Sequence, residues 1–179
     1  SQWLTSVHAT PEKLYPDYRT GLLAALLLEC GGSRLKALCA GAEEVPSLPP
    51  GMAAQLDVPL PSALVRELFV DAALGTQWEL SVQAGSAPRL TCTQACSSFS
   101  AASATVGRVA SMLERMLEEG MHASKAEAIA LVLRGRRVSI ELGPSNGGAL
   151  LSMRDLECVA AIHCELARSG GSSLQPVTS

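Results

Sequence analysis

The residues best suited to chemistry in this chain are its cysteines and histidines. Three residues separate Cys92 from Cys96, and His163 directly precedes Cys164, so these four side chains could supply the ligands of a zinc ion. Zinc knuckles usually place two residues between their cysteines, and adjacent residues on a helix point about 100° apart. The spacing therefore favours packed thiols, and we predict no metal and no other cofactor.

A catalytic nucleophile would need a histidine beside a cysteine or a serine. The chain has only His8, His122 and His163, and it carries no G-x-S-x-G, H-E-x-x-H or glycine-rich phosphate-binding motif. We therefore predict no catalytic residues and no enzymatic activity. An unrecognised enzyme that uses Cys92, Cys96 or His163 is kept as an alternative.

Arg134, Arg136 and Arg137 form the densest basic cluster. They lie at the C-terminal end of a predicted helix, whose dipole attracts positive charge there, so a structural role is the first interpretation. The net charge is −3 and the sequence shows no broad basic face, so nucleic acid is not an expected partner. The alternatives are a nucleic-acid-associated module built on this cluster, or contact of Arg136 and Arg137 with an acidic protein.

The composition describes a chain that can bury a core. Of its 179 residues, 47% are hydrophobic and 17% charged, which suits one domain with a small helical arm. Six loosely spaced cysteines without a signal-peptide pattern indicate an intracellular, reducing compartment, either cytoplasm or nucleus. The most apolar run, Gly21–Glu29, is much shorter than the roughly 20 residues that a membrane span requires, so no span is expected.

The N-terminal part is predicted to be helical. A helix is expected from Tyr18 to Cys30, ended by Gly31 and Gly32, and a short second helix from Ser33 to Ala40. Five prolines between residues 46 and 61 predict a connector without regular structure. These boundaries give a helical arm (1–45), a proline-rich connector (46–61), an α+β domain (62–168) and a flexible tail (169–179).

From Pro61 onward the pattern predicts a helix, two strands and a second helix. The first helix ends at Gly75, which can adopt the left-handed conformation of a helix stop. Apolar and polar residues alternate over 77–82 and 89–93, which predicts a hairpin with one covered face. A long amphipathic helix is expected over 97–118.

The C-terminal part is predicted to repeat this order. Ser124 and Glu127 form a capping box, which predicts the start of a helix. The elements expected are a helix over 124–134, a strand over 137–142, a turn over 143–148, a strand over 149–153 and a helix capped by Ser152.

Two αββα-like units follow from these patterns. Gly75 matches Gly135 and Trp78 matches Val138, although shared ancestry of the two halves stays open. Each hairpin has one apolar face and needs helices to cover it. The predicted fold is therefore α+β, with the two hairpins joined edge to edge in an antiparallel sheet covered by helices on one side.

The predicted function is a non-enzymatic interaction subunit or domain of a larger protein assembly. The first helix is too apolar for an exposed arm, and sheet edges invite pairing with a second chain. The expected partners are other protein chains, in a hetero-complex or a homodimer. The predicted contact residues are Leu22, Leu23, Leu26 and Leu27, with Arg136 and Arg137 beside them.

Overall fold

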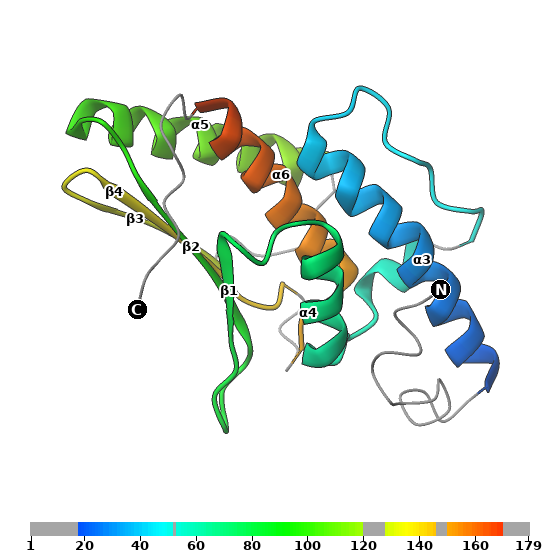
Figure 1. Cartoon of the computed structure of the whole chain (residues 1–179). Coiled ribbons are helices and arrows are strands. Elements are labelled where there is room, and N and C mark those ends of the chain that lie inside the picture. Colours follow the sequence, from blue (N-terminus) through cyan, green and yellow to red (C-terminus); the bar gives the residue numbers. More distant parts are fainter. Residues whose placement is uncertain (1–17, 52, 120–127, 146–149, 170–179) are drawn as a thin grey trace.

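The computed structural model describes residues 18–51, 53–119, 128–145 and 150–169 and confirms the α+β class. Four antiparallel strands form one sheet in the order β1-β2-β4-β3. Helix α5 packs on β3 and β4, α6 lies beside α5, and α3 lies along α6 (Figure 1). The elements are α3 (Tyr18–Ala40), η1 (Ala53–Asp57), α4 (Ser62–Asp71), β1 (Trp78–Ser81), β2 (Arg89–Ala95), α5 (Phe99–Glu118), β3 (Ile129–Arg134), β4 (Arg137–Leu142) and α6 (Met153–Ser169).

The sheet has one covered face, as its alternating pattern predicts. Trp78, Cys92 and Ile140 stand opposite one another on β1, β2 and β4, and all three are buried in the core. On the other face, Thr93 and Ser139 share a hydrogen bond between their hydroxyl groups at 3.1 Å. The two hairpins meet through β2 and β4, which is the edge-to-edge joining expected from sequence.

The second unit differs from its predicted order. Residues 129–134, expected to end a helix, form strand β3, because Ile129, Leu131 and Leu133 point to the helix-covered side and pair with β4. Gly135, expected to stop that helix, lies in the turn between β3 and β4 with a φ of 60°. The capping box Ser124–Glu127 lies outside the described residues.

The predicted strand over 149–153 is also wrong where the structure describes it. Residue 149 is outside the description, and Ser152 makes only an isolated bridge with Pro59. The next residue, Met153, already begins α6. The two halves are therefore related as β1-β2-α5 and β3-β4-α6, so β1 corresponds to β3, whereas the matching of Trp78 with Val138 aligned β1 with β4.

Helix α3 is continuous where two helices were expected. Gly31 is buried against α6, and a Cβ placed on it would lie 2.3 Å from Cε of Met153. The glycine therefore permits close approach of two helices and does not end α3. Similarly, the turn after α4 uses Ala73, with a φ of 58°, in place of the predicted Gly75.

Two buried or half-buried ion pairs tie the N-terminal elements to α6. Arg34 of α3 donates from Nε to Oε1 of Glu157 at 2.6 Å, and from Nη1 to the carbonyl oxygen of Pro46 at 2.6 Å. Asp57, the last residue of η1, accepts a bond from Nε of Arg154 at 2.8 Å. The connector was predicted to lack regular structure, but it contains the short 3₁₀ helix η1, which the Asp57–Arg154 pair fixes to α6. The predicted domain boundaries stay predictions.

The first turn of α6 is held by a buried carboxylate. Asp155 has no exposed surface, and its Oδ2 accepts from the Ser152 backbone N–H at 2.9 Å. Its Oδ1 accepts from the backbone N–H of Ser145 at 3.1 Å, and its own N–H donates to the Ser152 hydroxyl at 3.4 Å. Ser152 therefore caps α6 as predicted, with Asp155 closing the reciprocal bond.

We predict that Asp155→Ala lowers the free energy of unfolding by about 3 kcal/mol. The substitution leaves two buried backbone N–H groups without their charged acceptor, and such bonds contribute about 1.5–3 kcal/mol each. Urea unfolding followed by circular dichroism measures the change. Asp71→Asn, at an exposed position of α4, is the control and is expected to stay within about 0.5 kcal/mol. Equal effects of the two substitutions would contradict the capping role.

Candidate binding sites at the sheet edge and beneath helix α5

The two predicted arginines lie at the β3–β4 hairpin. Arg136 is in the turn and Arg137 begins β4, and both are exposed together with Arg134. Arg134 stands opposite Arg137, so the hairpin end carries a concentrated positive charge. The other predicted contact residues, Leu22, Leu23, Leu26 and Leu27, lie on α3, but their side chains are outside the described residues.

The main chain of β3 offers hydrogen-bonding groups along its outer edge. Hydrogen-bonded pairs alternate along an antiparallel ladder, and the Gly143 N–H donates to the Ala128 carbonyl at 2.7 Å. Continuing that alternation, Ala130 and Val132 direct their N–H and C=O groups toward β4. The main-chain N–H and C=O groups of Ile129, Leu131 and Leu133 therefore point away from β4, toward the open edge of the sheet.

No further strand covers this edge in the part of the chain that the structure describes. The side chains of Ile129, Leu131 and Leu133 are half-buried under α5, and Val132 on the open face is 38% exposed. Uncovered edges of this kind are templates for pairing, and natural proteins usually protect them with charges or proline. Residues 129–133 contain neither.

The cysteines and histidine considered for catalysis are distributed over several elements. Cys92 lies in the centre of the sheet, Cys96 follows β2, and His163 and Cys164 lie on α6. Among the residues that the structure places, no three His, Cys, Asp or Glu side chains are close enough to hold a metal ion. The six cysteines are free thiols.

Burial is the largest cause of the pKa shifts at Cys92, Cys158 and His163. It raises the pKa of the Cys92 thiol to about 11 and that of Cys158 to about 12, with the nearby Asp155 adding to the shift at Cys158. It also lowers the pKa of His163, whose buried Nδ1 has no hydrogen-bond partner among the described residues. A nucleophilic cysteine needs the opposite shift, toward a lower pKa, so Cys92 and Cys158 are electrostatically unsuited to that role.

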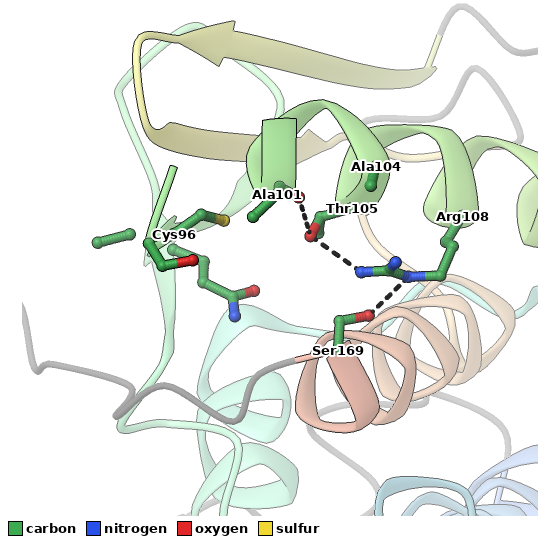
Figure 2. A pocket seen from close by; sticks show the side chains of 9 residues that line it. Cys96, Ala101, Ala104, Thr105, Arg108 and Ser169 are labelled. Atoms are coloured by element: carbon green, nitrogen blue, oxygen red, sulfur yellow. Dashed lines mark hydrogen bonds between the residues drawn. The ribbon is translucent and has the colours of Figure 1, made fainter. Parts of the chain in front are cut away.

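A pocket of about 180 Å³ lies at the end of β2, between Cys96, the Ala101–Arg108 part of α5 and Ser169 of α6 (Figure 2). Strand β1 begins at Trp78, opposite Cys92, so Gln94 and Ala95 of β2 have no β1 residue beside them. The turn after β2, one face of α5 and the last residue of α6, Ser169, complete the wall. The hollow therefore results from unequal strand lengths and from the position at which α6 ends.

Arg108 forms the polar wall of the pocket. Its Nη2 donates to Oγ1 of Thr105 at 3.1 Å, and its Nε donates to Oγ of Ser169 at 2.9 Å (Figure 2). Oε1 of Glu165 lies 3.8 Å from the same Nε, so the positive charge is partly balanced. Thr105 in turn donates to the carbonyl oxygen of Ala101 at 2.9 Å. These contacts hold the guanidinium in one orientation at the C-terminal end of α6.

Gln94 supplies an unsatisfied acceptor to the same pocket. Its side chain faces the helices, only 5% of the residue is exposed, and Oε1 has no hydrogen-bond partner within the described structure. An unpaired buried acceptor lowers the stability of the folded chain by about 1–3 kcal/mol. Packing alone therefore does not explain a glutamine at this position. The sequence carried a signal for it, because Gln94 occupies an inward position after Leu90 and Cys92.

Comparison of the chain with protein-family models, curated proteins and solved structures gives no match. Within the described residues, no helix combines the length and the apolarity needed to cross a membrane.

We predict that Gln94→Met raises the free energy of unfolding of the ligand-free chain by about 1 kcal/mol. The substitution keeps the side-chain length and removes the unpaired acceptor, whose burial is unfavourable. Urea unfolding measures the change, with Gln83→Met at an exposed position as the control. Destabilisation by Gln94→Met would show that the amide makes a stabilising bond in the folded chain.

We also predict that iodoacetamide modifies the cysteines selectively at pH 8. With a pKa of about 11, Cys92 is a thiolate in roughly one molecule in a thousand at this pH, and Cys158 in fewer. Cys30, Cys96 and Cys164, all half-buried, should react first. Peptide mass spectrometry over time measures the order, and denaturant should abolish it. Modification of Cys92 as fast as Cys96 would contradict the prediction.

Proposed function

We propose that this chain is a non-enzymatic interaction domain that binds another polypeptide by strand addition to β3. The observation that carries the proposal is the outward direction of the main-chain groups of Ile129, Leu131 and Leu133 at an edge without a covering strand in the described structure. Three outward residues offer three N–H donors and three C=O acceptors. Main-chain bonds of this kind provide the affinity in strand-addition complexes.

The side chains around the β3 edge favour particular residue types in the partner strand. A strand added beside β3 would place alternate side chains against the half-buried leucines and against Val132 on the open face. Apolar or β-branched residues suit both positions. At the hairpin end, the exposed Arg134, Arg136 and Arg137 favour acidic residues in the flanking part of the partner.

The proposal leaves the predicted leucine contacts as a separate hypothesis. Residues 29–40 of α3 lie against α6, where Arg34 and Gly31 make close contacts. Leu22, Leu23, Leu26 and Leu27 precede that segment in α3. A partner bound by strand addition at β3 does not require contact with these four residues.

We predict that Leu131→Pro reduces recovery of bound proteins at least tenfold in affinity purification with quantitative mass spectrometry. Proline removes the outward N–H of residue 131, while the N–H groups that pair with β4 belong to Ala130 and Val132. Leu131→Ala is the matched control, because it shortens the side chain and keeps the N–H. It should retain the same proteins.

Circular dichroism and thermal unfolding establish that both variants are folded before the comparison. Equal recovery by the Leu131→Pro and Leu131→Ala variants would contradict strand addition at β3. Failure of the wild-type chain to retain any protein would contradict the proposed function as a whole.

A further inference from the structure

The pocket beneath α5 is separate from the β3 edge. The strand order places β4 between β3 and β2, and the residues that line the pocket come from β2, the turn after it, α5 and α6, with none from β3 or β4. It combines a buried acceptor, Oε1 of Gln94, with a fixed donor group, the guanidinium of Arg108. The chemistry of these two groups restricts what the pocket can accept.

We propose that this pocket binds the side-chain carboxamide of a glutamine or asparagine in an extended polypeptide. A carboxamide carries an NH₂ group that can donate to Gln94 and an oxygen that can accept from Arg108. One neutral group therefore satisfies both pocket residues. No other common side-chain terminus supplies an acceptor and two donors in a single planar group.

Three other ligand classes, namely carboxylates, ammonium groups and apolar side chains, meet an unfavourable contact. A carboxylate accepts from Arg108 but supplies no donor to Gln94, and it lies near the carboxylate of Glu165. An ammonium group is repelled by Arg108. An apolar side chain would leave the Gln94 acceptor buried and unpaired. The balanced Arg108–Glu165 pair thus favours a neutral polar ligand.

The main chain beside the pocket indicates that the ligand is a polypeptide. The Cys96 N–H donates to the Arg136 carbonyl at 2.7 Å, so Cys96 and Gln94 direct their main-chain groups toward β4. By alternation, Ala95 directs its N–H and C=O to the opposite side, beyond the first residue of β1. An extended peptide can pair with Ala95 while one of its side chains enters the pocket.

The test uses the full chain, labelled with ¹⁵N, and three acetylated and amidated pentapeptides, TVQVT, TVEVT and TVLVT. The glutamine peptide is expected to bind at least tenfold more tightly than the glutamate and leucine peptides. The amide signals of Ala95, Ala101 and Ser169 and the side-chain amide of Gln94 should shift on saturation. Equal affinities for the three peptides, or shifts confined to β3, would overturn the proposal.

Two variants test the assigned groups. Gln94→Met should remove the preference for glutamine over leucine while leaving a folded spectrum. Arg108→Lys keeps the charge but cannot bond Thr105, Ser169 and a ligand in one plane, so the glutamine peptide should bind at least fivefold more weakly. An unchanged preference in the folded Gln94→Met variant would overturn the role of Gln94.

Free glutamine distinguishes the source of the carboxamide. Binding of free glutamine as tight as that of the peptide would support the carboxamide site and overturn the polypeptide ligand. The Leu131→Pro variant should bind the glutamine peptide as the wild type does, because β3 contributes no residue to the pocket and β4 lies between β3 and β2. Failure of this site therefore leaves strand addition at β3 unaffected, and the reverse also holds.

Discussion

The buried carboxylate of Asp155 is the contact on which the rest of the arrangement depends. Through Ser145 and Ser152 it closes the first turn of α6 and fixes the segment that follows β4. The same turn receives η1 through Arg154 and α3 through Met153. A charged acceptor is suited to this position, because it satisfies several backbone donors at once and complements the positive end of the helix dipole.

This cap fixes where α6 begins, and the length of the helix then sets where it ends. A helix of 17 residues extends about 25 Å, so the start at Met153 places Ser169 at the far end of the core, beside Arg108. Arg108 then supplies the positive charge that a helix C-terminus attracts, and Thr105 holds the other side of its guanidinium. The pocket wall is thus a consequence of helix length and of a cap made by distant residues.

Several elements could be predicted from sequence because a local pattern determines them. Helix α5 follows from its amphipathic period, and its inner face buries Val109 and Leu113. The place of Ser152 before an apolar helix indicates its role as a cap. Strand β3 was predicted to be helical, because a short apolar run fits either element. Pairing with β4 decided the outcome. Gln94 could have been noticed by its inward position, whereas Arg108 and Ser169 meet only through the packing of α5 on α6.

The unequal protection of the two edges of the sheet gives the two candidate sites different properties. At β3 the available groups are mainly backbone, which any extended chain can match, so sequence preference must come from Val132 and the hairpin arginines. At the end of β2 only Ala95 offers backbone pairing, and the specific groups are side chains held by packing. The β3 edge can therefore bind extended chains with little selectivity for their sequence. The pocket can select one side chain but contributes little to the overall affinity. Only β4 lies between β3 and the pocket strand β2, and the Cys96 N–H bonded to the Arg136 carbonyl brings the hairpin turn next to the pocket.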